Sequence, residues 1–77
     1  MRIVVYTKSG CPNCVTAKRL LDDKGIGYEE HYADIPFVLE ALQKAHPEAR
    51  QMPQIFIDGQ RVGGLAGLQA ALKELGL

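Results

Sequence analysis

The only two cysteines of the chain, Cys11 and Cys14, stand three residues apart, with Pro12 between them. Thiols at this spacing can form a metal-ligand pair, a structural disulfide or a reversible dithiol–disulfide couple. If a helix begins here, the two residues face the same side with Cα atoms about 5–6 Å apart, within the span of a disulfide. Pro12 suits the first position of such a helix, where its missing N–H costs no hydrogen bond. The spacing therefore allows a disulfide to close and open without backbone movement.

The two sulfur positions differ in their expected electrostatics. Cys11 stands at the entry of the predicted helix, where free N–H groups and the positive end of the helix dipole favour a thiolate. Lys8 adds a positive charge nearby. Cysteines in such places have pKa values lowered to about 3.5–7.5. We predict that Cys11 is the exposed, attacking sulfur and that Cys14, one turn inside, is the resolving thiol.

Zinc binding and a purely structural disulfide both fit the sequence less well. A closed zinc site needs four ligands, and beyond the cysteines only His31 and His46 are available, without the paired spacing of a zinc finger. No metal site is predicted. A disulfide between residues three apart closes too small a loop to restrict the unfolded chain much. The spacing therefore favours a disulfide that is repeatedly made and broken.

Composition narrows the class of protein. We expect one domain over residues 1–77, since the chain is short. Nine basic and nine acidic residues cancel, which leaves no basic stripe for a nucleic acid. The first apolar run has only four residues, 3–6, too few for a secretory signal or a membrane span. We expect a soluble, cytoplasmic monomer, in whose reducing compartment a lasting structural disulfide is out of place.

Hydrophobic patterning places the cysteines between a strand and a helix. Residues 2–7 predict a strand buried on both faces, and the spacing after the cysteines predicts a helix stopped by Gly25. The Asp58–Gly59 pair signals a tight hairpin, whereas the acidic pair Glu29–Glu30 suggests a solvated face. The remaining expected elements are strands at 28–32, 54–57 and 60–62 and helices at 35–45 and 65–75. This order predicts an α/β fold with a four-stranded mixed sheet and helices on both faces.

Four segments in this order resemble the glutaredoxin family, which has the thioredoxin-like fold: YTKSGCPNC, AKRLLDDKGI, MPQIFIDG and VGG. The resemblance spans nearly the whole chain. It implies a four-stranded mixed sheet flanked by three helices, in the order strand-helix-strand-helix-strand-strand-helix. It also implies a disulfide oxidoreductase that reduces protein disulfides, such as that of ribonucleotide reductase, and glutathione mixed disulfides. Glutathione would be a co-substrate, and no tightly bound cofactor is implied.

The resemblance also implies roles for individual residues. Cys11 is similar to the family's nucleophile and Cys14 to its resolving thiol. Pro53 matches a cis-proline facing the cysteines, and Met52 before it would pair through its backbone with a bound peptide, a mode that tolerates varied sequences. The implied residues for binding substrate or glutathione are Lys8, Pro12, Asn13, Met52, Pro53 and Gly64, Lys8 matching the lysine near the glycine carboxylate of glutathione.

The chain departs from the family pattern where glutathione would bind. Asn13 replaces the usual tyrosine, and Leu65 and Ala66 follow Gly64 where the family commonly has a small polar residue and an aspartate. Glu40 stands at a position that is often basic or an amide. One lost charge-assisted contact costs about 1.5–3 kcal/mol. Reduction by a thioredoxin reductase, as in related redoxins, is therefore a second hypothesis beside reduction by glutathione.

A non-catalytic role is the alternative from another class. The chain could be a thioredoxin-like adaptor or an iron–sulfur carrier that bridges two copies. Relatives that carry clusters usually depend on one cysteine and often have C-G-F-S where this chain has C-P-N-C. Because Cys14 is retained, the sequence favours dithiol chemistry.

Overall fold

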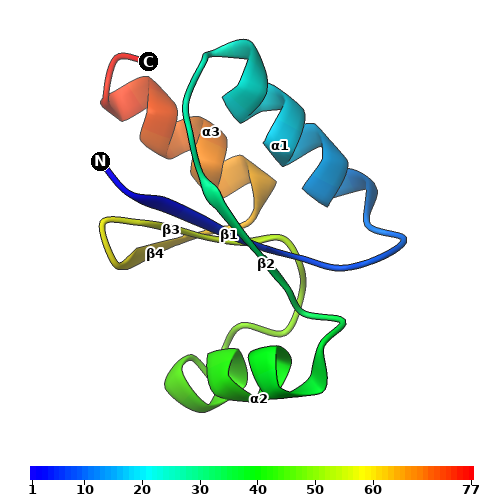
Figure 1. Cartoon of the computed structure of the whole chain (residues 1–77). Helices are drawn as coiled ribbons and strands as arrows, with labels where there is room; N and C mark the ends of the chain where they lie inside the picture. Colours follow the sequence, from blue (N-terminus) through cyan, green and yellow to red (C-terminus); the bar gives the residue numbers. More distant parts are fainter.

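The computed structural model describes all 77 residues and contains one four-stranded sheet in the order β2-β1-β3-β4 (Figure 1). β1 pairs with β2 in parallel and with β3 antiparallel, and β4 pairs antiparallel with β3. The elements are β1 (Ile3–Thr7), α1 (Pro12–Asp23), β2 (Glu29–Tyr32), α2 (Pro36–Ala45), β3 (Gln54–Ile57), β4 (Gln60–Gly63) and α3 (Leu65–Glu74). The predicted mixed sheet and element order are confirmed, with element ends that shift by a residue.

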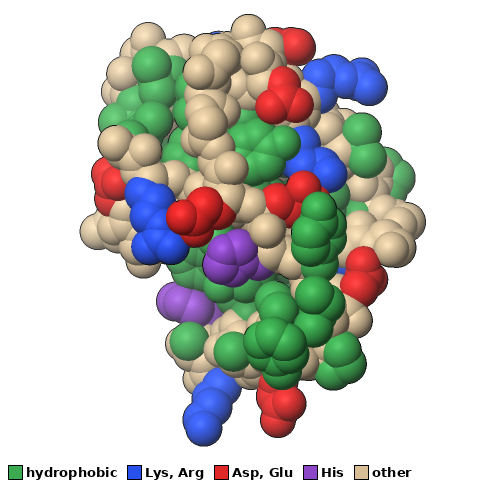
Figure 2. Space-filling model, viewed as in Figure 1, with side chains coloured by type: hydrophobic (Ala, Val, Ile, Leu, Met, Phe, Trp, Pro, Cys, Tyr) green, Lys and Arg blue, Asp and Glu red, His purple; other side chains and the backbone are tan.

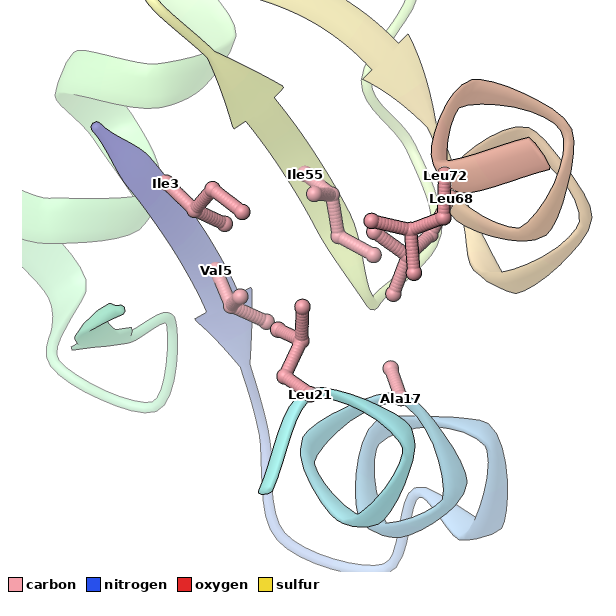
Figure 3. Packing of buried hydrophobic residues seen from close by; sticks show 7 residues of the cluster. All are labelled: Ile3, Val5, Ala17, Leu21, Ile55, Leu68 and Leu72. Atoms are coloured by element: carbon pink, nitrogen blue, oxygen red, sulfur yellow. The ribbon is translucent and has the colours of Figure 1, made fainter. Parts of the chain in front are cut away.

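The sheet separates two layers of helices. α1 and α3 lie together over one face, and α2 lies alone over the other (Figure 1). Alternate residues of β1 point into the α1–α3 layer, where Ile3 and Val5 are almost fully buried. The main core consists of seven buried residues from these elements: Ile3, Val5, Ala17, Leu21, Ile55, Leu68 and Leu72 (Figure 3).

The α2 side of the sheet is more thinly covered. Val4 and Tyr6 pack against a smaller cluster of Leu42, Ala49 and Phe56, and both stay partly exposed. The prediction that β1 is buried on both faces is thus confirmed for the α1–α3 face and too strong for the other, because one short helix covers less area than two.

The hairpin between β3 and β4 has the predicted turn. Asp58 and Gly59 adopt positive φ values of 50° and 83°, the conformation that a two-residue turn matched to strand twist requires. The Asp58 carboxylate also accepts a hydrogen bond of 2.8 Å from the Arg2 N–H. The hairpin therefore holds the beginning of β1 as well as its own two strands. No helix is long and apolar enough to cross a membrane.

Truncation of the main core should lower stability markedly. Leu21 is fully buried between α1 and the sheet, so Leu21→Ala should reduce the free energy of unfolding by about 2–5 kcal/mol. Urea unfolding followed by circular dichroism measures this loss. Leu75→Ala is the matched control, since Leu75 is 52% exposed. Equal losses in the two variants would contradict the assignment of Leu21 to the core.

Candidate redox site

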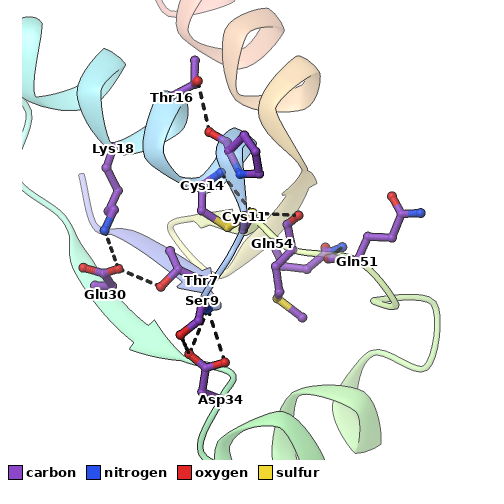
Figure 4. The surroundings of a disulfide bond; sticks show 12 residues. Thr7, Ser9, Cys11, Cys14, Thr16, Lys18, Glu30, Asp34, Gln51 and Gln54 are labelled. Carbon is purple, nitrogen blue, oxygen red and sulfur yellow. Dashed lines mark hydrogen bonds and ion pairs between the residues drawn. A yellow bond between two sulfur atoms is a disulfide. The ribbon is translucent and has the colours of Figure 1, made fainter.

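The first turn of α1 positions both cysteines. Cys11 caps the helix in an extended conformation, Pro12 occupies the first helical turn, and Cys14 follows within it. The two sulfurs form a disulfide, and the Cα atoms are 5.3 Å apart (Figure 4). The predicted helix start and the predicted closeness of the cysteines are therefore confirmed.

The sulfur of Cys11 lies at the positive end of the helix. The backbone N–H of Cys14 donates a hydrogen bond of 3.1 Å to Cys11 Sγ, as an N-cap side chain normally receives from the first turn. The same N–H groups would face a thiolate at this position once the disulfide is reduced, and hydrogen bonds to an ionised acceptor are stronger than those to a neutral one. The geometry thus favours negative charge on Cys11 over Cys14.

Cys11 is less accessible than the sequence suggested. Its exposed fraction is 9%, against 2% for Cys14. Cys11 is thus the more exposed of the two cysteines, as predicted, but the description of Cys11 as exposed is wrong. The segment before β3 causes the burial, because the Met52 carbonyl oxygen lies 3.4 Å from Cys11 Sγ. The Met52–Pro53 peptide bond is cis, as the resemblance implied. Only a small part of Cys11 therefore reaches the solvent.

Two hollows adjoin Cys11. One, of about 380 Å³, is formed by predicted site residues and by Gly10 and Gln51; those predicted residues are Lys8, Cys11, Pro12, Asn13 and Met52. Pro53, which follows Met52, is buried, and a Cβ added to Gly64 would lie 3.5 Å from the Pro53 carbonyl oxygen. The fold therefore places Lys8, Pro12, Asn13 and Met52 in one hollow with Cys11, and it brings Gly64 close to Pro53. Cys14 lines the second hollow.

The second hollow, of about 260 Å³, contains polar residues that sequence reasoning missed. Asp34 accepts hydrogen bonds from the Ser9 N–H at 2.9 Å and from the Ser9 hydroxyl at 2.9 Å (Figure 4). These contacts fasten the loop that carries Lys8 and leads to Cys11. Ser9 and Asp34 are 25 residues apart, and no spacing pattern links them in the sequence.

Glu30 also lines this hollow, contrary to its assignment to a solvated face. Its side chain is only 19% exposed. Glu30 Oε2 accepts hydrogen bonds of 2.9 Å from Lys18 Nζ and 2.7 Å from Thr7 Oγ1 (Figure 4). The parallel pairing of β2 with β1 and the alternation of side chains along β2 turn Glu30 toward α1, which the acidic run alone could not reveal.

Burial and hydrogen bonding act on Glu30 in opposite directions. Burial, the largest single influence, disfavours its charged form, but the hydrogen bonds from Lys18, Thr7 and Tyr32 and the positive charge of Lys18 together outweigh it. The pKa of Glu30 is therefore lowered from its ordinary value of 4.5. The hydrogen bond to Glu30 in turn raises the pKa of Lys18. Both groups are charged at neutral pH.

The two histidines lie away from the cysteines, between the sheet and α2. Figure 2 shows both rings at the surface near this junction. The His31 ring packs edge-on against Tyr6 with centroids 5.0 Å apart, and the His46 ring lies 4.9 Å from that of Phe56. No group of three or more His, Cys, Asp or Glu side chains is placed to hold a metal ion.

The start of α3 differs from a site for an ammonium group. Gly64 is the N-cap, no side chain caps the helix, and the first turn contains no acidic residue. Leu65 is partly buried and packs against the main core, whereas Ala66 is exposed. A Cβ on Gly67 would collide with the Val62 carbonyl, so glycine is required for α3 to approach β4. Free N–H groups are present here, without a carboxylate.

Known proteins that are similar to this chain in sequence and structure are described as glutaredoxins or as glutaredoxin-like. The sequence model described as Glutaredoxin matches residues 3–62. Glutaredoxin 1 of Rickettsia bellii is 41% identical over 76 residues, covering 94% of this chain and 78% of that protein. A buckwheat glutaredoxin–glutathione complex has a TM-score of 0.78 at 26% identity, covering 94% and 68%. The NrdH-redoxin of Escherichia coli, described as glutaredoxin-like with a thioredoxin-like activity profile, has a TM-score of 0.77 at 27% identity, covering 91% and 93%.

The lowered pKa of Glu30 predicts a pH-dependent contribution to stability. A carboxylate whose pKa is lower in the folded chain stabilises fully above its ordinary value of 4.5 and loses this contribution as pH falls through the lower, folded value. Glu30→Gln should therefore lower the free energy of unfolding by about 1 kcal/mol at pH 7. The loss should become progressively smaller below pH 4.5. Urea unfolding at several pH values measures the difference.

Glu29→Gln is the matched control for this pH dependence. Glu29 pairs with Arg2 at 2.9 Å, but both side chains are more than half exposed, so solvent and salt weaken the pair. Its effect should be smaller and should vanish in high salt. A constant loss for Glu30→Gln across the pH range would contradict the stabilising role of the carboxylate.

Proposed function

Because this chain belongs to the glutaredoxin family and is a thiol–disulfide oxidoreductase with a Cys11–Cys14 couple, we propose that Cys11 is its nucleophile and Cys14 its resolving thiol. The observation that supports this assignment is the hydrogen bond from the Cys14 N–H to Cys11 Sγ. It favours ionisation of one sulfur only. The lower exposure of Cys14 supports the same order, because an external disulfide meets Cys11 first.

The proposed reaction consists of two exchanges. The Cys11 thiolate attacks a substrate disulfide, so that a Cys11–substrate disulfide forms and the other substrate sulfur leaves as a thiolate that takes up a proton. Cys14 then loses its proton and attacks Cys11 Sγ, which releases the second substrate thiol. The product is the Cys11–Cys14 disulfide, whose Cα separation of 5.3 Å needs no backbone rearrangement.

Substrates are proposed to bind in the hollow beside Met52. Its lining supplies the Lys8 ammonium, the Asn13 amide and the backbone of Met52 around the narrow exposed face of Cys11. Main-chain hydrogen bonds to Met52 would hold an extended peptide without reading its side chains. This suits protein disulfides of varied sequence, and the proposed substrates include that of ribonucleotide reductase. One chain holds the whole site, which supports action as a monomer.

Glutathione is the proposed reductant. The family uses glutathione as a co-substrate, and Lys8 at the hollow offers a positive charge to one of its carboxylates. Pro12 lines the same hollow, and Gly64 lies close to Pro53, the residue after Met52, which supports the same ligand. The proposed compartment is the cytoplasm, where a reduced glutathione pool is present.

A specific observation favours a second candidate reductant. The first turn of α3 has no acidic residue to pair with the ammonium group of glutathione, and the fold is also similar to that of an NrdH-redoxin. A thioredoxin reductase would not need that contact. The question of reductant therefore turns on Ala66, the exposed residue at the position where an aspartate is common in the family.

Cysteine variants should separate the two sulfur roles. Cys11→Ser should abolish reduction of every disulfide, because no attacking thiolate remains. In Cys14→Ser, the rate of reduction of a protein disulfide such as that of insulin should fall by at least about 100-fold. The variant should still release glutathione from a mixed disulfide, because that reaction requires a single sulfur. Steady-state rates on both substrates measure this. Activity of Cys11→Ser equal to that of the parent would refute the assignment.

Comparing electron donors should identify the reductant. We expect turnover with NADPH, glutathione reductase and glutathione, and slow turnover with NADPH and thioredoxin reductase. Ala66→Asp should tighten glutathione binding by about ten- to a hundredfold, since it adds one charge-assisted contact. Calorimetric titration of Cys14→Ser and of Cys14→Ser/Ala66→Asp with glutathione measures this gain. Turnover only with thioredoxin reductase would refute glutathione as the reductant and would assign thioredoxin reductase in its place.

A further inference from the structure

One ion pair lies beside the disulfide but has no part in the two exchanges. Lys18 projects from α1 and Glu30 from β2, and their charged ends meet at 2.9 Å on the side of the sheet that carries the cysteines (Figure 4). Both side chains line the same 260 Å³ hollow as Cys11 and Cys14. The nearly buried Thr7 anchors the carboxylate from β1. The pair is therefore held in place close to the redox couple.

The charged side chains around the couple sum to zero. Lys8 from the loop before α1 and Lys18 from α1 contribute two positive charges. Glu30 from β2 and Asp34 after β2 contribute two negative charges, and Tyr32 is the remaining titratable group of this hollow. The hollow on the Met52 side adds no charged residue beyond Lys8. Removal of either partner of the Lys18–Glu30 pair thus leaves one uncompensated charge next to the cysteines.

An uncompensated charge here would act on the sulfurs with limited screening. The side chains of Lys18 and Glu30 are 31% and 19% exposed, so part of the field passes through protein of low effective dielectric constant. Charges that are partly buried in this way are screened less by salt than fully exposed charges. The size of the interaction is therefore set by the protein more than by the buffer.

We propose that the Lys18–Glu30 pair sets the reducing power of the Cys11–Cys14 couple by keeping the local charge at zero. Reduction breaks the Cys11–Cys14 bond and creates a thiolate at Cys11. A lone Lys18 charge stabilises this reduced form, whereas a lone Glu30 charge destabilises it. The pair touches no reacting atom, so both residues act on the couple through the field at Cys11. This inference rests on the proposed ionisation of Cys11.

Equilibration with glutathione provides the measurement. Two glutathione thiols give two electrons to the protein disulfide and join as glutathione disulfide. One of their protons passes to Cys14, Cys11 remains a thiolate, and the other proton is released. Quenching with acid and alkylating the free thiols gives the ratio of reduced to oxidised protein at each glutathione ratio.

The two single variants should shift this ratio in opposite directions. Glu30→Gln should raise the reduced-to-oxidised ratio by about three- to tenfold, and Lys18→Gln should lower it by a similar factor, as expected for one partly screened charge. The double variant should return to within about twofold of the parent. The pH midpoint for alkylation of Cys11 should fall in Glu30→Gln and rise in Lys18→Gln. Lys18→Arg, which keeps the charge, should resemble the parent.

Glu29→Gln again supplies the control. It removes the same charge from the neighbouring position of β2, but from the other face of the strand and from a residue that does not line the hollow. Its ratio should change less than twofold. Shifts of the same sign in Glu30→Gln and Lys18→Gln, no shift in either, or an equal shift in Glu29→Gln would each overturn the proposal.

Two features keep this test separate from folding and from the choice of reductant. Opposite shifts cannot come from a shared loss of structure, and Lys18→Gln alone still tests the sign if Glu30→Gln does not fold. Dithiothreitol can replace glutathione in the equilibration, because its exchange needs no glutathione site. Failure of the parent with glutathione but not with dithiothreitol would count against the proposed reductant alone.

Discussion

The contact on which this protein depends is the one between the start of α1 and the sulfur of Cys11. A helix begins with N–H groups that have no partner within the helix, and here the side chain of the N-cap residue is a cysteine that accepts from the Cys14 N–H. The same turn brings the second sulfur to disulfide distance. One local structure thereby brings a sulfur that accepts a helix-start hydrogen bond within disulfide distance of a second sulfur.

The sheet presents the turn through its central strand. β1 lies between β2 and β3 and leads directly into the loop before Cys11. Its core residues fix one end of this connection, and the Asp34–Ser9 contacts hold the loop at the other. α1 and α3 pack on the same face and bury the inner side of the helix that begins at the cysteines. The redox turn is thus rigid on its inner side and accessible only at its rim.

Two long-range contacts then decide what the turn can do. The Met52 carbonyl oxygen lies 3.4 Å from Cys11 Sγ, and Met52 lines the hollow beside this sulfur. The Lys18–Glu30 pair places opposite charges on the other side of the couple, and Thr7 holds it there. The first contact partly buries Cys11, and the second places a pair of opposite charges in the hollow that the cysteines line.

The sequence by itself determined the features that depend on neighbouring residues. The cysteine spacing, Pro12, the apolar run of β1 and the Asp58–Gly59 turn each act over a few residues, so the helix start, the element order and the hairpin could all be predicted. The family resemblance added the cis bond before Pro53. Only the tertiary structure decided the burial of Cys11 by Met52 and the removal of Glu30 from solvent. Cys11 and Met52 are 41 residues apart in the sequence, and Lys18 and Glu30 are 12 residues apart. Such contacts form because strand pairing and helix packing determine which face each side chain occupies.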